Sequence, residues 1–253
     1  MRQVTINPSN FFYIISFPRS GNTWIVNTLR EYLGAQRAEL LPSVYGGEEL
    51  LINGSLPVKV AGEYTPTLPV GIKTHMYRGE FDRKRFPPSR ILYLVRDVRD
   101  VMTSYYFYIN GFLNQDAEAV TNFSADHFQE HLEQRLPEYR NHLHGWFKKP
   151  GHDVFIVRYE ELKADYVDTL KKMKSFLQLD NIASEGDVKY KYVDNFQKQD
   201  NFTSVLRGNN MDFYRKGVVG DWKNYFTEKH VKTVKRVTGE MLIELGYETD
   251  LNW

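Results

Sequence analysis

The sequence predicts an α/β protein, a three-layer α/β/α fold built on a central parallel sheet. Apolar runs short enough to be buried strands alternate along the chain with segments of helical spacing, and this order is typical of a parallel sheet covered by helices. The 253 residues contain no obvious linker, internal repeat or low-complexity tract, so we expect a single domain over residues 1–253. The four predicted strands are residues 11–17, 70–74, 90–96 and 153–158.

The first predicted strand leads into a loop and then a helix. Pro18 cannot donate a ladder hydrogen bond, so the strand ends there, and the helical pattern begins at Trp24. The backbone N–H groups at a helix start favour an anion, and the loop adds side-chain donors and one fixed charge. These loop residues are Arg19, Ser20, Gly21, Asn22 and Thr23.

This P-loop-like segment differs from the loop of nucleotide triphosphatases, which ends in Gly-Lys-Ser/Thr. Here Arg19 precedes the glycine, and Asn22 stands in the place of the lysine. The loop therefore suits a phosphate or sulfate group and argues against ATP and magnesium chemistry. A tight turn that only caps the helix is the alternative interpretation.

Residues 34–69 lack a clean period and contain several Pro and Gly residues, so they are expected to be loops with at most short helices. A long irregular stretch in a compact domain is often a binding loop. The strand 70–74 then brings Lys73 and His75 to its carboxyl end, where ligands bind in open α/β sheets. Because these two residues are two apart, strand alternation places them on one face.

The strand 90–96 ends at Arg96, and Asp97 is a plausible N-cap for a helix that contains Ser104. Arg96 and Ser104 together would hold a second phosphate. Asp97, Arg99 and Asp100 are expected to form caps or surface pairs.

The rest of the chain adds helices and a basic loop. We expect helices over residues 123–148, 167–177 and 227–245, and the strand 153–158 ends at Tyr159. Histidines in the first of these helices lack cysteine or carboxylate partners, so no metal site is expected. A Gly- and Asn-rich loop carries the basic residues Arg207, Arg215 and Lys216.

Net charge, apolar run length and cysteine content limit the classes of partner and the compartment that we expect for this protein. The formal net charge of +1 provides no bulk field for nucleic acid or an anionic membrane, and no apolar run is long enough to span a bilayer. The absence of cysteine excludes thiol catalysis and fits a reducing compartment. We expect a cytoplasmic protein with no nucleic-acid or membrane partner.

Four segments together resemble the sulfotransferase family that uses 3′-phosphoadenosine 5′-phosphosulfate (PAPS). They occur in the family's order and span residues 11 to about 227. Ser16-Phe-Pro-Arg-Ser-Gly-Asn-Thr-Trp24 is similar to the 5′-phosphosulfate loop, and Lys73-Thr-His75 to the catalytic Lys-Thr-His. Tyr93-Leu-Val-Arg96 through Ser104-Tyr-Tyr106 resembles the 3′-phosphate segment, and Arg215-Lys-Gly-Val-Val-Gly-Asp-Trp-Lys223 resembles the C-terminal signature.

The resemblance implies a role for each matching residue. Residues of the first loop would hold the 5′-phosphosulfate and one face of adenine: Arg19, Ser20, Gly21, Asn22, Thr23 and Trp24. The 3′-phosphate would be held by Arg96, Ser104, Arg215, Lys216 and Gly217. Tyr159 matches the adenine-contacting tyrosine of the family, and Phe196 its adenine-side phenylalanine.

Two departures from the family matter. Arg19 replaces the usual lysine, so it keeps the charge but cannot give up a proton as a general acid. The family's dimer motif becomes Lys223-Asn-Tyr-Phe-Thr227-Glu228 and ends in Lys232, which leaves a monomer and a homodimer both open.

The implied reaction is in-line transfer of a sulfo group, with His75 as general base and with Lys73 and Arg19 neutralising developing charge. No metal is required, because these cations take its place. A P-loop-type nucleotide kinase and a non-catalytic nucleotide-binding module are the competing hypotheses. The acceptor would be a small molecule with a hydroxyl or amine, and Glu48, Glu63 and Asp116 favour a polar or cationic one.

Overall fold

The computed structural model describes residues 11–33, 36–40, 49–52, 58–59, 69–84, 89–114, 116, 118, 121–147, 153–179 and 216–253. The chain divides into two compact units. The first comprises Met1–Val95 and Lys148–Tyr190, and the second comprises Arg96–Phe147 and Lys191–Trp253.

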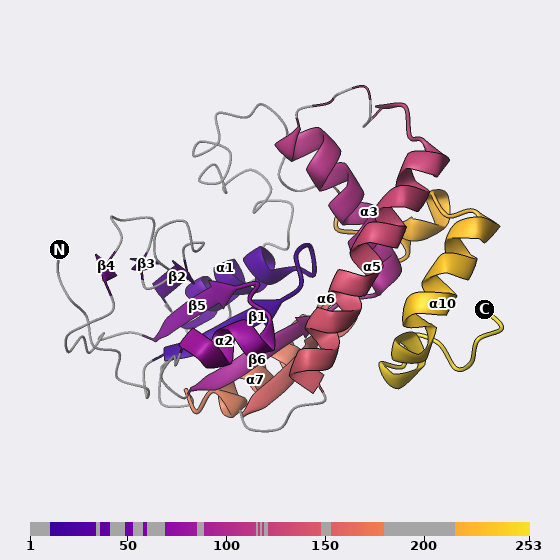
Figure 1. Cartoon of the computed structure of the whole chain (residues 1–253). Coiled ribbons are helices and arrows are strands. Elements are labelled where there is room, and N and C mark those ends of the chain that lie inside the picture. The colour runs from indigo at the N-terminus through magenta and orange to yellow at the C-terminus, as the bar shows by residue number, and fades with distance from the viewer. Residues whose placement is uncertain are drawn as a thin grey trace. The chain divides into compact units, whose positions relative to one another are not determined.

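The first unit is built on a seven-stranded sheet in the order β4-β3-β2-β5-β1-β6-β7 (Figure 1). β1 (Phe11–Ser16) lies between β5 (Val70–Thr74) and β6 (Arg90–Val95), parallel to both. β7 (Val154–Arg158) extends the parallel part beyond β6, and β2 (Gln36–Leu40) extends it beyond β5. All six residues of β1 are buried, as expected for a central strand whose two faces are both covered.

Helices complete the layers around this sheet. α1 (Asn22–Leu33) follows β1 and contacts β1, β2 and β5, while α7 (Tyr166–Phe176) contacts β7. α2 (Arg78–Lys84) packs on the sheet through Phe81, whose ring centroid lies 4.9 Å from that of Tyr13 on β1. The short α6 (Tyr159–Ala164) follows β7 directly. The predicted α/β class with a central parallel sheet is confirmed.

The prediction of loops over residues 34–69 is wrong for three short stretches. β2, β3 (Glu49–Ile52) and β4 (Val58–Lys59) are strands, and β3 pairs antiparallel with both of its neighbours. These strands are two to five residues long. Segments of this length show little periodicity, and their hydrogen bonds come from pairing between strands, of β2 with β5, β3 with β2 and β4 with β3.

The second unit is mainly helical. α3 (Val98–Phe107) continues into a π-helical turn, Tyr108–Leu113, and α5 (Ala125–Phe147) packs against both α3 and α10 (Glu228–Glu244) (Figure 1). A short 3₁₀ helix, η4, covers Asp221–Asn224. The core of the second unit is aromatic: Tyr106 and Phe128 pack edge to face with ring centroids 5.3 Å apart, which is a favoured ring geometry. The predicted helices at 98, 123–148, 167–177 and 227–245 are thus present in the two units, with bounds shifted by one or two residues.

Candidate active site

The loop between β1 and α1 has a backbone shape that few residues adopt. Arg19 has φ +69° and Gly21 has φ +100°, both in the left-handed region. Glycine adopts this conformation freely, whereas a side chain such as that of Arg19 pays roughly 1–2 kcal/mol for it. Strain of this kind concentrates at ligand sites, where it pre-arranges donors. The loop then enters α1 through a hydrogen bond from the Ile25 N–H to the Gly21 carbonyl, 3.1 Å long.

Asn22 ties this loop to two strands. Its Nδ2 donates to the carbonyl oxygens of Ile14 and Thr74, each at 3.3 Å, and these residues lie near the carboxyl ends of β1 and β5. Two buried side-chain oxygens in the same loop, Asn22 Oδ1 and Ser20 Oγ, have no hydrogen-bond partner. A buried polar atom without a partner costs about 1–3 kcal/mol, and a bound ligand that reaches these oxygens would remove that cost. The Ser20 hydroxyl can donate to an anion, while Asn22 Oδ1 requires a donor.

The end of β5 brings a base and a cation to this loop. Lys73 Nζ donates to the hydroxyl of Thr23 at 3.0 Å. The imidazole of His75 is exposed, and its Nδ1 lies 2.7 Å from the carbonyl oxygen of Ser16. Since a carbonyl oxygen only accepts, Nδ1 carries the proton in the neutral ring, and the lone pair is at Nε2. The backbone of Ser16 therefore sets the tautomer that a general base requires.

Aromatic side chains adjoin the same loop. Tyr159, the first residue of α6, lies so close to Gly21 that a Cβ at that glycine would stand 2.7 Å from the tyrosine ring. The Trp24 ring packs edge to face on Tyr159 with centroids 5.3 Å apart, and stacks on Tyr166 with centroids 5.9 Å apart. Hence two of the residues expected at adenine, Trp24 and Tyr159, are in contact with each other beside the loop.

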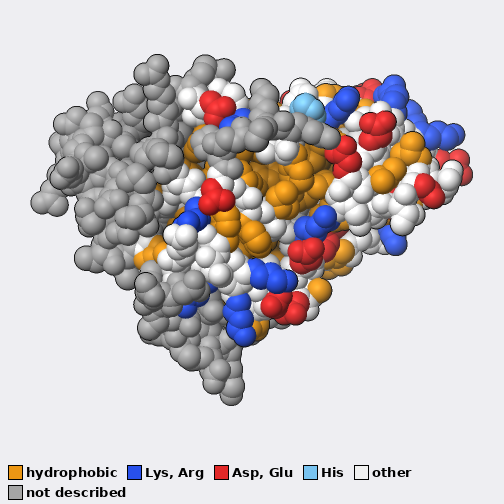
Figure 2. All heavy atoms as spheres, turned by 90° about the horizontal axis from the view of Figure 1, so that it is seen from below, with side chains coloured by type: hydrophobic (Ala, Val, Ile, Leu, Met, Phe, Trp, Pro, Cys, Tyr) orange, Lys and Arg blue, Asp and Glu red, His pale blue; other side chains and the backbone are white. Residues whose placement is uncertain are grey.

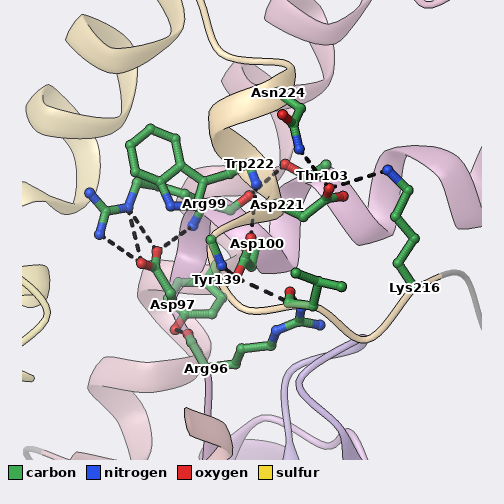
Figure 3. A network of polar contacts seen from close by, with 12 residues as sticks. Arg96, Asp97, Arg99, Asp100, Thr103, Tyr139, Lys216, Asp221, Trp222 and Asn224 are labelled. Atoms are coloured by element: carbon green, nitrogen blue, oxygen red, sulfur yellow. Dashed lines mark hydrogen bonds and ion pairs between the residues drawn. The ribbon is translucent and has the colours of Figure 1, made fainter.

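The remaining candidates belong to the second unit. Arg96 is 5% exposed, and its Nη2 donates to the carbonyl oxygen of Val218 at 3.1 Å and lies 3.8 Å from a carboxylate oxygen of Asp100. The Tyr139 hydroxyl donates to the Arg96 carbonyl at 3.0 Å (Figure 3). Ser104 is buried two turns along α3. Arg96 is therefore held in place by both its main chain and its side chain.

The C-terminal signature is docked on the start of α3. Asp100 accepts hydrogen bonds from the N–H of Gly220 at 2.7 Å and from that of Trp222 at 3.0 Å (Figure 3). Burial is the main cause that raises the pKa of Asp100, against the lowering effect of Arg96 and of these two N–H groups. The Asp100 carboxylate therefore binds main-chain N–H groups of the protein itself.

Lys216 and Gly217 lie just before this turn. Lys216 Nζ donates to Asp221 Oδ1 and to the Tyr225 hydroxyl, each at 3.2 Å, and the tyrosine hydrogen bond is the main cause that raises the lysine pKa. Gly217 has φ +62°, which brings the backbone into the turn without strain. Arg215 and Phe196 lie outside the described residues.

The candidate residues are divided between the two units. Arg19, Lys73, His75 and Tyr159 belong to the first, and Arg96, Ser104, Lys216 and Gly217 belong to the second. Their union into one donor site stays a prediction, as does the single domain.

The sequence did not predict the contact between His75 and the Ser16 carbonyl. It also led us to expect that Arg99 and Asp100 form only caps or surface pairs. Asp97 is a cap, since its side chain accepts from the Arg99 N–H, but Arg99 and Asp100 are 4% and 1% exposed and not surface pairs. A run of charges directly after an apolar strand was the signal that could have marked them as buried.

On the face shown in Figure 2, basic and acidic side chains of the described residues are interspersed. Among the described residues, none of the helices is long and apolar enough to cross a membrane. The same residues contain no group of three or more metal-ligating side chains of His, Asp or Glu.

A family model described as "Sulfotransferase domain" matches residues 10–246. The chain is 26% identical to mouse sulfotransferase 2A6 over 91% of its own length and 83% of that protein. It is also 26% identical to the flavonol 3-sulfotransferase of Flaveria bidentis, over 94% of this chain and 83% of that one.

Solved structures show the same fold. A mouse sulfotransferase, SULT7A1, complexed with PAP superposes with a TM-score of 0.57 at 20% identity, over 94% of this chain and 86% of that one. A retinol dehydratase in complex with androsterone and the inactive cofactor PAP gives a TM-score of 0.59 at 16% identity, over 94% and 82%. The family and enzyme class predicted from the four segments are confirmed.

Proposed function

Because the chain belongs to the sulfotransferase domain family, we propose that it transfers the sulfo group of PAPS to a hydroxyl or amine of a small-molecule acceptor. One observation carries the proposal most directly. An exposed imidazole, with its tautomer set by the Ser16 carbonyl at 2.7 Å, stands at the end of β5, the strand that also brings Lys73 to the strained anion loop.

The reaction follows from these groups. The acceptor oxygen or nitrogen attacks sulfur and forms a new bond to it, while the bond from sulfur to the 5′-phosphate oxygen breaks. His75 Nε2 takes the acceptor proton, and adenosine 3′,5′-bisphosphate (PAP) leaves with the electron pair. Lys73 and Arg19 stabilise charge on the sulfonyl and bridging oxygens as that bond breaks, and no proton has to pass through Arg19.

The donor is assigned to the residues of both units. The 5′-phosphosulfate and adenine are assigned to Arg19, Ser20, Gly21, Asn22, Thr23, Trp24 and Tyr159, with Phe196 as a further adenine contact. The 3′-phosphate is assigned to Arg96, Ser104, Arg215, Lys216 and Gly217. In support, Ser20 has a buried hydroxyl without a partner, and Arg96 is a buried, pre-positioned cation.

The acceptor class rests on the relatives. They are named for flavonols, hydroxysteroids and amines, all small molecules with a hydroxyl or amine. A polar or cationic acceptor, a cytoplasmic location and the choice between monomer and homodimer belong to the proposal. Asp116 is exposed, and Glu48 and Glu63 lie outside the described residues.

The deciding experiment is an acceptor screen with PAPS, read as the mass gain of one sulfo group. We expect transfer to at least one small hydroxyl or amine compound without added metal. Stabilisation by ATP with magnesium, greater than that by PAP in a thermal shift, would favour a kinase. Tight PAP binding without transfer to any acceptor would favour a non-catalytic module.

A further inference from the structure

Arg99 occupies a corner made by two indole rings. Its guanidinium carbon lies 4.3 Å from the centroid of Trp222 and 4.4 Å from that of Trp253. The two rings are inclined at 78° with centroids 6.2 Å apart. Cation–π contacts of a buried guanidinium with tryptophan are the strongest of their kind.

Two carboxylates complete the surroundings of Arg99. Its Nη2 lies 2.6 Å from Asp97 Oδ2, its Nε lies 2.9 Å from Asp97 Oδ1, and Nη1 pairs with Glu248. A planar fork with five donors can serve two carboxylates and two rings at once, whereas a lysine ammonium cannot. Arg99 therefore joins α3, η4 and the segment after α10.

The turn formed by residues 218–222, which Arg99 contacts through Trp222, also contains Val218, whose carbonyl accepts a hydrogen bond from Arg96. Asp100 accepts from the main chain of Gly220 and Trp222, and Arg96 donates to the carbonyl of Val218 at 3.1 Å (Figure 3). A shift of the Trp222 ring would move the backbone of this turn, and with it the oxygen that orients the Arg96 guanidinium.

The segment after α10 forms the outer wall of the corner. α10 ends at Glu244 with Leu245 as its C-cap, and Gly246 with φ +69° reverses the chain, so that the N–H groups of Tyr247 and Glu248 donate to the Leu242 carbonyl at 2.8 and 3.2 Å. The reversal leads the chain back to Arg99, where Glu248 and Trp253 meet the guanidinium.

We propose that Arg99 and Trp253 form a clamp that positions the 218–222 turn and thereby the 3′-phosphate end of the donor site. Both are positioning residues, which act through Trp222 and Arg96 and touch no substrate. The inference rests on the proposed function, because it assigns the 3′-phosphate to Arg96.

The test compares two ligands that differ by one group. Calorimetry would measure the affinity for PAP and for adenosine 5′-monophosphate, which lacks the 3′-phosphate, in the full chain. We expect Trp253→Ala to weaken PAP binding by about tenfold and to leave the monophosphate affinity unchanged. Trp253→Phe, which keeps a ring against Arg99, should recover most of the loss, and Arg99→Lys should behave like Trp253→Ala.

Asn252→Ala is the matched control, because this neighbouring side chain is exposed. An unchanged ratio of the two affinities in Trp253→Ala would overturn the clamp. Equal weakening of both ligands would also overturn it, since that result indicates a general structural role. If the wild-type protein itself does not prefer PAP, the 3′-phosphate assignment of the proposed function fails first, and the clamp falls with it.

Discussion

Lys73 on β5 donates a hydrogen bond of 3.0 Å to the hydroxyl of Thr23 in the first turn of α1. Thr23 is neutral, and an anionic oxygen that reaches the same ammonium would form a stronger, charge-assisted bond. The contact therefore holds the lysine beside the anion loop.

Lys73→Met should lower kcat by about 10²–10³-fold, the usual cost of losing one donor to transition-state charge. Methionine keeps the length and apolar stem of lysine, so packing changes little. Initial rates with an acceptor from the mass screen would measure the loss. Lys229→Met, at an exposed lysine of α10, is the control and should leave the rate unchanged. Equal activity of both variants would remove Lys73 from the proposed chemistry.

His75→Ala should lower turnover by about 10²–10⁴-fold, since a general base contributes that much. PAP affinity should stay within about twofold, because the proposed function assigns the imidazole to the acceptor and gives it no contact with the nucleotide. Rates and calorimetry on the same preparation separate the two effects. His144→Ala, at an exposed histidine, serves as comparison. Near wild-type turnover in His75→Ala would rule out the role of base.

The variants Gly21→Ala and Gly220→Ala separate the cost of backbone strain at positive φ from the cost of a steric clash of the new Cβ. Both glycines have positive φ, but a Cβ at Gly21 would stand 2.7 Å from the Tyr159 ring, while a Cβ at Gly220 would meet nothing within 4 Å. We expect Gly220→Ala to cost about 1 kcal/mol of unfolding free energy and Gly21→Ala about 1–3 kcal/mol more. Urea unfolding measures both values. Only Gly21→Ala should also weaken the binding of adenosine 5′-monophosphate, and equal effects of the two variants would contradict the close approach of Tyr159 to the loop.

Arg96→Lys should raise the KM for PAPS by at least about tenfold with a smaller change in kcat, because lysine keeps the charge but loses the fork. Lysine also avoids leaving the buried Asp100 carboxylate without a cation. Arg140→Lys, at an exposed position of α5, controls for the substitution itself. An unaltered KM for PAPS would count against the 3′-phosphate assignment.

Stability should fall in mild acid because of His131. Burial, helped by the charge of Arg135, lowers the pKa of His131 to about 4, so the folded protein keeps this ring neutral where the unfolded chain protonates it. The unfolded state then binds more protons between about pH 6.5 and 4, and unfolding free energy decreases as pH falls through this window, by roughly 3 kcal/mol at most.

His131→Gln tests the cause, because glutamine does not titrate. Its unfolding free energy, followed in urea at pH 7 and pH 5, should decrease less between the two values than that of the wild-type protein. His144→Gln, at an exposed histidine of the same helix, controls for the substitution itself. An identical loss in His131→Gln would show that other groups drive the acid sensitivity.

Much of the fold followed from local pattern. The strands of the sheet centre are continuous apolar runs, and the helices at 98 and 227 begin at recognisable caps, so periodicity and capping chemistry located them. The strands β2 to β4 did not follow, because two to five residues carry too little periodicity and these strands depend on pairing with one another and, for β2, with β5. The π-helical turn at Tyr108–Leu113 likewise has no signal in the sequence.

The sequence by itself indicated an anion loop and a strand-end base through residue type and spacing, and the resemblance of its four segments to a known family implied the reaction class and the candidate residues. Only the tertiary structure decided how those residues are held. It placed the Ser16 carbonyl under His75, buried Asp100 beneath the backbone of Gly220 and Trp222, and enclosed Arg99 between Trp222 and Trp253. Such contacts join residues tens of positions or more apart, and spacing along the chain carries no information about which distant groups meet.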